Sequence, residues 1–265
     1  MREALVEIAQ IAGRAILAVY ERDFAVQQKA DQSPLTEADL ASHEQIVTAL
    51  AALTPDVPVL SEESAEIPYA QRSTWSRYWL VDPLDGTQEF IRRNGEFTVN
   101  IALIEQGRPV LGVVYVPVSG VSYVGEVGVG AWKQQPTGEQ TAICVCRPCQ
   151  QPLRLVASRS HVSPALQPVL DQMGEHQLVS MGSSLKLCLV AEGAADVYPR
   201  LGPTCEWDTA AAQAVVEAAG GQVTDLAGRP LGYNQKDSLL NPHFLGESPA
   251  PPLPTASPSP SSPPW

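Results

Sequence analysis

Residues 79–87 read WLVDPLDGT. The apolar residues at the start of this stretch predict a buried strand, and the proline and Gly86 that follow predict a tight turn. That turn holds Asp82 and Asp85 close together, and two neighbouring carboxylates persist best with a cation between them. Carboxylate oxygens on a rigid turn suit Mg²⁺ better than Zn²⁺, and Thr87 adds groups that can donate to a phosphate. The stretch therefore predicts a metal-dependent phosphate site, with a turn of two solvated carboxylates as the alternative.

Two further segments place acids at the ends of predicted elements. Residues 57–60 form a short apolar run that predicts a strand, and Glu62 and Glu63 follow it closely. Asp208 stands at the start of an alanine-rich segment that predicts a helix. One acidic turn is common, but three acidic element ends in one chain indicate a single assembled cation site.

Together these segments resemble the inositol monophosphatase superfamily of Mg²⁺-dependent, Li⁺-sensitive phosphatases. Residues 88–100, QEFIRRNGEFTVN, narrow the resemblance to the bacterial 3'(2'),5'-bisphosphate nucleotidase branch. The similarity runs from the N-terminus to about Leu245. It implies an α+β fold, a layered αβαβα sandwich of the inositol monophosphatase and sugar phosphatase type. It also implies hydrolysis of the 3'-phosphate of adenosine 3',5'-bisphosphate to AMP and phosphate, which clears the by-product of sulfate activation.

The resemblance implies two or three bound Mg²⁺ ions and a set of ligands for each ion. One ion would take Glu62, Asp82 and the main-chain carbonyl of Leu84. A second would take Asp82, Asp85 and Asp208, so that Asp82 bridges the two ions. A third, weaker ion would be held by Glu62 and water.

Three residues are implied to be catalytic. Asp39 and Thr87 match the pair that orients the attacking water in the family, and Glu62 completes the set. The sequence predicts a helix from Ser33 or Pro34 to about residue 53, with Thr36 and Asp39 as a capping box. An exposed helical Asp39 and a Thr87 that merely caps the following segment are the alternatives.

The resemblance also implies the residues that hold the substrate. Gly86 and Thr87 would bind the scissile phosphate through backbone N–H groups. Ser183 and Lys186 match nucleotide-contacting positions, although an ordinary helix cap with a solvated lysine would produce the same segment.

Two further residues match the family less strictly. His161 would face the adenosine and Arg200 the second phosphate, and a structural role explains each equally well. The full substrate-binding set is Gly86, Thr87, His161, Ser183, Lys186, Arg200 and Asp208.

Composition limits the class of protein. The chain has 265 residues, of which 44% are hydrophobic, enough for one large core or two small ones. Its 17 Lys and Arg against 29 Asp and Glu leave a net charge of -12, which argues against binding a nucleic-acid polymer. An anionic small molecule, here a nucleotide bisphosphate, remains possible because bound cations invert the local field. The oligomeric state is expected to be monomer or homodimer.

The N-terminus carries acids within its apolar pattern and predicts no signal peptide, and no apolar run predicts a transmembrane segment. An odd number of cysteines, five, favours a reducing cytoplasmic location. Cys144, Cys146 and Cys149 suggest a zinc clip, but no fourth ligand lies nearby, so free thiols are the simpler interpretation. Cys205 departs from the family pattern close to Asp208, without an evident role.

Periodicity predicts helices followed by a sheet in the first half and strand–helix alternation in the second. We therefore expect a metal-binding α+β domain at 1–135, a smaller α/β substrate-binding domain at 136–246, and a disordered Pro/Ser-rich tail at 247–265. Predicted helices are 2–21, 33–53, 164–173, 184–191 and 209–219. Predicted strands are 57–60, 78–81, 98–105, 110–116, 121–124, 131–133, 153–157, 178–180 and 195–198.

Two other functions stay open on the sequence. The same metal turn would serve an inositol-1-phosphate phosphatase. The discrimination rests on Lys186, Arg200 and residues 92–100, because a second phosphate on the substrate calls for extra cations away from the metals. A catalytically silent nucleotide-binding sensor is the hypothesis from another class, and the presence of every implied metal ligand counts against it.

Overall fold

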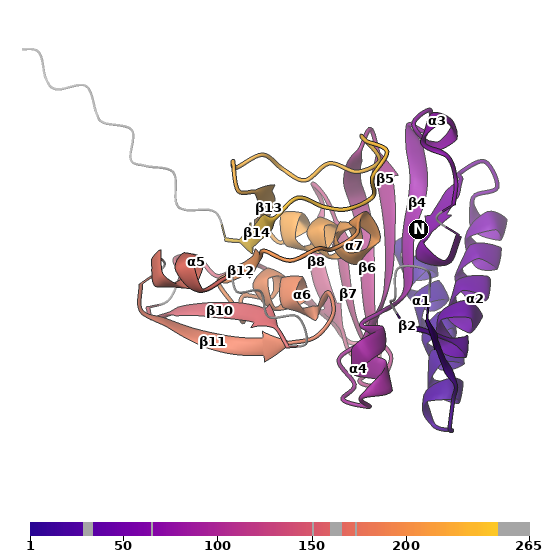
Figure 1. Cartoon of the computed structure of the whole chain (residues 1–265), viewed down its shortest axis with the longest axis horizontal. Helices are drawn as coiled ribbons and strands as arrows, with labels where there is room; N and C mark the ends of the chain where they lie inside the picture. Colours follow the sequence, from indigo (N-terminus) through magenta and orange to yellow (C-terminus); the bar gives the residue numbers. More distant parts are fainter. Residues whose placement is uncertain (29–33, 65, 150, 160–165, 173, 249–265) are drawn as a thin grey trace, which may run out of the picture.

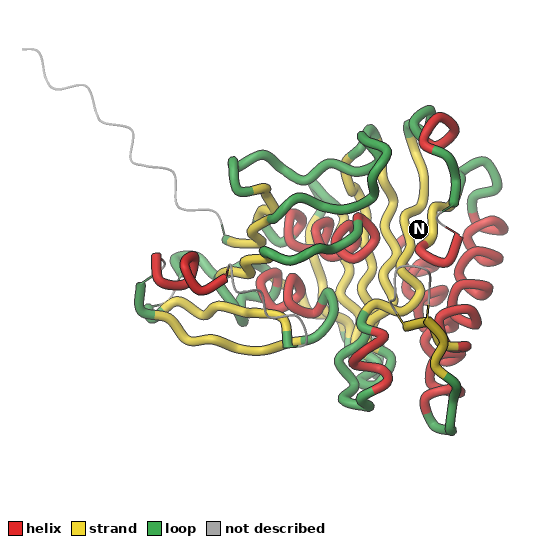
Figure 2. Tube along the Cα trace, in the orientation of Figure 1, coloured by secondary structure: helices red, strands yellow, loops and turns green. Residues whose placement is uncertain are grey.

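The computed structural model describes residues 1–28, 34–64, 66–149, 151–159, 166–172 and 174–248. These residues form five layers in which helices and sheets alternate (Figures 1 and 2). The layers are the helix pair α1 and α2, a seven-stranded sheet, the helices α6 and α7, a five-stranded sheet, and the helix α5. The predicted αβαβα sandwich is therefore confirmed.

The large sheet has the strand order β3-β4-β5-β6-β7-β8-β9. Only the first pair, β3 with β4, is parallel, and the remaining neighbours are antiparallel. The strands are β3 (Val59–Ser61), β4 (Arg77–Asp85), β5 (Thr98–Glu105), β6 (Arg108–Val116), β7 (Val121–Glu126), β8 (Gly130–Gln134) and β9 (Gln140–Ile143).

Both faces of this sheet are buried, which explains why β4 is an unbroken apolar run. Trp79 and Val81 pack on the side of α1 and α2, whereas Tyr78 and Leu80 pack on the side of α6 and α7. Because side chains alternate along a strand, Asp82 is expected on the α7 side. The apolar strand thus carries a carboxylate toward the middle helical layer.

Helices α1 (Arg2–Tyr20) and α2 (Glu37–Leu53) cover the outer face of the large sheet. The predicted start of the second helix near residue 33 is wrong, because Pro34–Thr36 forms the short strand β2 instead. Thr36 is the N-cap residue, and the predicted capping box with Asp39 is confirmed. Extended backbone at Thr36 and the box itself place the helix start at Glu37.

The opposite face of the large sheet is covered by α6 (Leu185–Ala191) and α7 (Glu206–Ala218). Two glycines allow α7 to lie directly on the strands. A Cβ built at Gly112 would stand 2.2 Å from the carbonyl oxygen of Ala211, and one at Gly125 would stand 2.4 Å from the Cα of Val215. This close approach brings the N-terminal turn of α7, with Asp208, to the end of β4.

The five-stranded sheet lies beyond these helices and has the order β11-β10-β12-β14-β13. Leu155 and Ala157 of β10 face outward against α5 (Leu166–Gln172), while Val156 faces α6 and α7. The strands are β10 (Leu153–Ser158), β11 (His176–Met181), β12 (Val197–Arg200), β13 (Gln222–Asp225) and β14 (Phe244–Glu247).

The remaining elements are short. Strand β1 (Val26–Gln28) pairs with β2 (Pro34–Thr36), a 3₁₀ turn spans Glu62–Ser64, and α3 (Tyr69–Arg72) and α4 (Thr87–Ile91) flank β4. The sequence predicted a helix start at Gly86 and Thr87, where α4 begins. It predicted none of the other short elements, nor β9, β13 and β14, because short elements carry little periodicity. Within the described residues, none of the helices has the length and apolar character required to cross a membrane.

The proposed division into two domains and a tail stays a prediction. Glu247, where the tail was expected to begin, instead ends β14, and Ser248 is buried. These two residues belong to the folded part, and residues 249–265 lie outside the described range.

Candidate active site

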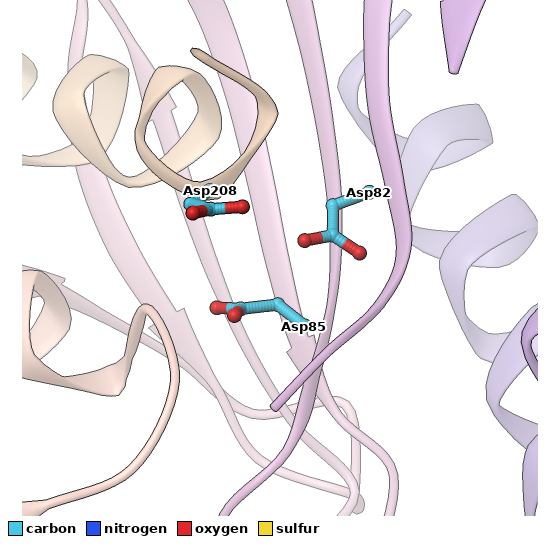
Figure 3. A group of neighbouring side chains, drawn as sticks. All are labelled: Asp82, Asp85 and Asp208. Atoms are coloured by element: carbon cyan, nitrogen blue, oxygen red, sulfur yellow. The ribbon is translucent and has the colours of Figure 1, made fainter. Parts of the chain in front are cut away.

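Three aspartates meet between the large sheet and the middle helical layer. Carboxylate oxygens of Asp82, Asp85 and Asp208 all lie within 4.8 Å of one another. Asp82 and Asp85 come from the end of β4, and Asp208 comes from the first turn of α7 (Figure 3). Side chains from two distant segments therefore converge on one point, as expected from the sequence.

An irregularity in β4 aims the first two aspartates at this point. The pairing with β5 shifts between Asp82 and Asp85, so the strand bulges around Pro83. The bulge is held at both ends, because the N–H of Leu84 donates to Asp82 Oδ1 at 3.1 Å and Ser42 donates to the Pro83 carbonyl at 2.7 Å. Residues three apart on a regular strand point to opposite faces of the sheet. Because of the bulge, the carboxylates of Asp82 and Asp85 instead point to the same side.

The cluster consists of carboxylates, of which Asp82 is buried and Asp85 and Asp208 are partly buried. Burial raises the pKa of Asp82 well above its ordinary range, and the charges of Glu62, Asp85 and Asp208 raise it further. The pKa of Asp208 is raised by burial and then by Asp85 and Glu62, although the N–H of Cys205 lowers it in part. Buried carboxylates that repel one another are stabilised by a cation, and an all-oxygen donor set fits a hard divalent metal such as Mg²⁺. The alternative of two solvated carboxylates is wrong, since Asp82 is buried.

Glu62 stands next to this cluster. It opens the 3₁₀ turn that follows β3, and β3 runs parallel to β4 with Ser61 opposite Val81. After burial, its charge is the largest influence on the pKa of Asp82. Glu62 is therefore placed where a shared cation would be in reach of both carboxylates.

Asp39 and Thr87 contact each other at the edge of the cluster. Thr87 Oγ1 donates to Asp39 Oδ1 and to the Leu84 carbonyl, each at 3.4 Å. The other oxygen of Asp39 accepts the N–H and the hydroxyl of Thr36, each at 2.7 Å. Asp39 is buried, so the alternative of an exposed helical aspartate is wrong. The capping box of α2 thus orients the carboxylate that Thr87 touches.

A cavity of about 520 Å³ opens beside the three aspartates. Six of the seven residues expected to bind substrate line it, and the seventh, His161, lies outside the described residues. Tyr198, Leu187 and Phe244 give one part of the wall an apolar character. The six expected lining residues are Gly86, Thr87, Ser183, Lys186, Arg200 and Asp208.

Two cations, Lys186 and Arg200, stand in the cavity wall. Lys186 is buried, donates to the Ser183 carbonyl and lies 5.5 Å from the ring centroid of Tyr198. Burial lowers the pKa of Lys186 to about 8, against the opposing effect of Asp85. Arg200 donates to the Pro203 carbonyl at 2.8 Å, and among the described residues its buried Nε has no hydrogen-bond partner. Because Lys186 is buried, the alternative of a solvated lysine is wrong.

Several residues of this region could not be recognised from the sequence. Thr98, Asn100 and Ser184 form a buried hydrogen-bond network behind Asp85. Glu89 is buried and lines the cavity, and Tyr198 lines it as well. Thr98 and Asn100 lie within residues 88–100, the stretch that narrows the resemblance, and Ser184 lies beside the expected substrate contact Ser183. Only the sheet register could have revealed their contacts with one another.

The cysteines do not form a metal clip in the described part of the chain. None of the five forms a disulfide, and the one group of acids, histidines or cysteines placed to hold a metal there consists of the three aspartates. Cys205 precedes α7, and its N–H donates to Asp208 Oδ2 at 2.8 Å. Its backbone therefore orients Asp208, whatever the thiol does.

Comparisons with known proteins agree with this geometry. The inositol monophosphatase family model matches residues 1–250. The chain is 54% identical over 246 residues to the 3'(2'),5'-bisphosphate nucleotidase CysQ of Escherichia coli (strain K12), covering 92% of this chain and 98% of that protein. It is 39% identical over 239 residues to CysQ of Haemophilus influenzae, covering 90% and 89%. The crystal structure of CysQ from Bacteroides thetaiotaomicron superimposes with a TM-score of 0.82 at 43% identity, covering 93% of this chain and 96% of that one.

Proposed function

This chain belongs to the inositol monophosphatase family, and from that membership we propose that it is a Mg²⁺-dependent 3'(2'),5'-bisphosphate nucleotidase. Its reaction is hydrolysis of the 3'-phosphate of adenosine 3',5'-bisphosphate to AMP and phosphate. The relatives at 54% and 39% identity that carry this activity in their names support the assignment.

The observation that carries the proposal is that one cavity is lined both by acids of the carboxylate cluster and by two buried cations. Asp85 and Asp208 line it, and with Asp82 they form the cluster where divalent metals would meet the scissile phosphate. Lys186 and Arg200 are buried in the wall of the same cavity. A substrate with two separate phosphates would use both the metals and these cations, whereas a simple monophosphate needs the metals alone.

Two or three Mg²⁺ ions fit the carboxylates present. We assign them to Asp82, Asp85 and Asp208, together with Glu62 and the Leu84 carbonyl. When bound, the metals neutralise phosphoryl charge, lower the pKa of water and assist the leaving oxygen.

The chain's own residues position the reacting groups. Asp39 accepts from Thr87, so the pair can hold a water beside the cluster and take its proton. The N–H groups of Gly86 and Thr87 would bind the scissile phosphate. Lys186 and Arg200 would bind the second phosphate, with Arg200 Nε available as a donor.

In the cell, this activity removes the by-product of sulfate activation. We place the protein in the reducing cytoplasm, in keeping with five cysteines that form no disulfide. The substrate is a small nucleotide, and the net charge of -12 disfavours a nucleic-acid polymer. The protein acts as a monomer or a homodimer.

The test is phosphate release by purified protein with Mg²⁺, comparing adenosine 3',5'-bisphosphate with inositol-1-phosphate, with and without Li⁺. Strong preference for the bisphosphate, inhibited by Li⁺, is expected. Preference for inositol-1-phosphate would reassign the protein within the family. Nucleotide binding without hydrolysis of either compound would indicate a silent sensor instead.

A further inference from the structure

A polar network joins Asp85 to the turn that precedes α6. The N–H of Ser184 donates to Asp85 Oδ2 at 2.6 Å, and the side-chain amide of Asn100 reaches the same oxygen at 3.4 Å. Asn100 lies on β5 directly opposite Asp82, so its side chain shares the face of the sheet that carries the aspartates. One carboxylate oxygen is therefore held from two different segments.

The side-chain amide of Asn100 acts as donor and acceptor at once. Its Nδ2 donates toward Asp85, while its Oδ1 accepts from Thr98 Oγ1 at 3.0 Å and from Ser184 Oγ at 2.9 Å. A rotated amide would set its oxygen against the Asp85 carboxylate, which can only accept, whereas the two hydroxyls can donate or accept. The Asp85 carboxylate thus fixes one orientation, with donor and acceptor ends of the amide used at once.

The hydroxyls extend this network into the cavity wall. Thr98 Oγ1 lies 2.6 Å from Ser183 Oγ and 2.9 Å from Ser184 Oγ, and all three side chains are buried. Ser183 has a φ of +53°, a left-handed conformation that non-glycine residues seldom adopt without support. The network supplies that support, because a buried hydroxyl released from it would lose its hydrogen bonds.

We propose that Asn100 is a positioning residue with two arms, meaning two sets of side-chain hydrogen bonds that can be removed separately. Its amide donor holds Asp85 beside Asp82 and Asp208, where metal ions would bind, and its carbonyl acceptor, through Thr98 and Ser184, holds the substrate-side turn at residues 183–184. The inference rests on the proposed function in taking Asp85 as a metal ligand. Hydrogen bonds to metal-binding carboxylates typically change metal affinity or activity by about 10- to 100-fold.

Each arm can be tested with an isosteric change. Asn100→Leu removes both arms at similar volume. Thr98→Val removes the Thr98 hydroxyl and its contacts with Asn100, Ser183 and Ser184, and it leaves the Asn100 amide and the Ser184 hydroxyl bond to it in place. Ser122→Ala serves as the matched control, because Ser122 is equally buried in the same sheet and its Oγ has no hydrogen-bond partner among the described residues.

The measurement is calorimetric titration of the metal-free proteins with Mg²⁺ alone, followed by substrate kinetics. Asn100→Leu is expected to raise the Mg²⁺ dissociation constant by about 10-fold or more. Thr98→Val is expected to leave that constant within about threefold of wild type and to raise KM for the bisphosphate. Ser122→Ala should match wild type in both measurements.

Unchanged Mg²⁺ affinity in Asn100→Leu would overturn the proposal, as would equal losses of Mg²⁺ affinity in Asn100→Leu and Thr98→Val. If Asn100→Leu does not fold by circular dichroism, the smaller polar Asn100→Ser replaces it with the same expectation. A wild-type protein that binds no Mg²⁺ would contradict this inference and the proposed function together. One that binds Mg²⁺ without hydrolysing the bisphosphate would contradict the function alone.

Discussion

Asp82 of β4 and Asp208 of α7 meet with carboxylate oxygens within 4.8 Å, and burial raises the pKa of both. The apolar strand delivers the first, and the glycines at positions 112 and 125 let α7 come close enough to deliver the second. The pair is therefore a consequence of how the middle helical layer packs on the large sheet. Its mutual repulsion makes a bound cation part of the site's stability.

Replacing Asp82 by Asn should abolish turnover and leave the fold intact. The amide keeps the shape of the side chain but removes a buried charge that the metals require. We expect steady-state hydrolysis to fall by several orders of magnitude, while the circular dichroism spectrum stays that of wild type. Loss of the folded spectrum would show that Asp82 is structural and would count against its role in the site.

The metal-free protein should lose stability as the pH rises from about 4 toward neutrality. An acid whose pKa is raised on folding holds its proton more tightly in the folded state, and the unfolded chain ionises first, near the ordinary value of 3.8. The folded state is therefore penalised increasingly as the pH climbs from that value toward the raised pKa values of Asp82 and Asp208. Thermal unfolding in EDTA across this range measures the effect.

Two comparisons isolate that pH effect from other titrations. Mg²⁺ should raise Tm more at pH 7.5 than at pH 5, because more of the carboxylate charge then needs a partner. Asp82→Asn should show a flatter loss of stability with pH in EDTA. Identical slopes for wild type and variant would contradict the raised pKa of Asp82.

Thr87→Val should lower kcat by about 100-fold while the Mg²⁺ dissociation constant stays near wild type. The valine preserves the branched shape but loses the hydroxyl that contacts Asp39. Thr87→Ser, which keeps a hydroxyl, is the control and should retain most of the activity. Equal activity in the two variants would exclude the hydroxyl from water orientation.

Lys186→Met should weaken the use of adenosine 3',5'-bisphosphate far more than that of inositol-1-phosphate, because only the former carries a second phosphate. In the wild type, kcat/KM for the bisphosphate should also fall as the pH rises through about 8, where Lys186 loses its charge. The variant should lack that fall. Equal losses on both substrates would remove Lys186 from substrate recognition.

Deleting residues 249–265 should leave kcat and KM unchanged. The family model ends at residue 250, and the last strand, β14, ends at Glu247. A longer deletion that also removes residues 244–248 is the contrast, and that variant should fail to fold because it lacks β14. A large loss of activity in the first deletion would assign the tail a role in the folded enzyme.

The sequence was sufficient for the parts of the site that have a local signature. Asp82 and Asp85 share one turn, Asp208 begins a helix, and Thr36 with Asp39 form a recognisable capping box. Each of these is set by residues a few positions away. The helix that contains Asp39 was nevertheless predicted to start too early, because Pro34 is equally compatible with a helix start and with β2.

The network around Asn100 could not be predicted in the same way. Thr98 and Asn100 lie within an apolar strand, and their partners Ser183 and Ser184 are more than 80 positions away in the chain. Their contacts depend on the register of β4 with β5 and on where α6 packs, and local periodicity predicts neither of these. The burial of Lys186 could not be predicted for the same reason, since its Nζ lies over the ring of Tyr198, a residue of the separate strand β12.

The most direct test of the metal site is an anomalous difference map from crystals of the protein grown with Mn²⁺, an oxygen-preferring divalent ion that stands in for Mg²⁺. We expect at least one strong peak within about 2.5 Å of carboxylate oxygens of Asp82, Asp85 and Asp208. Crystals without a peak among these aspartates, from a preparation that hydrolyses the bisphosphate with Mn²⁺, would contradict the assignment of these residues as the metal ligands.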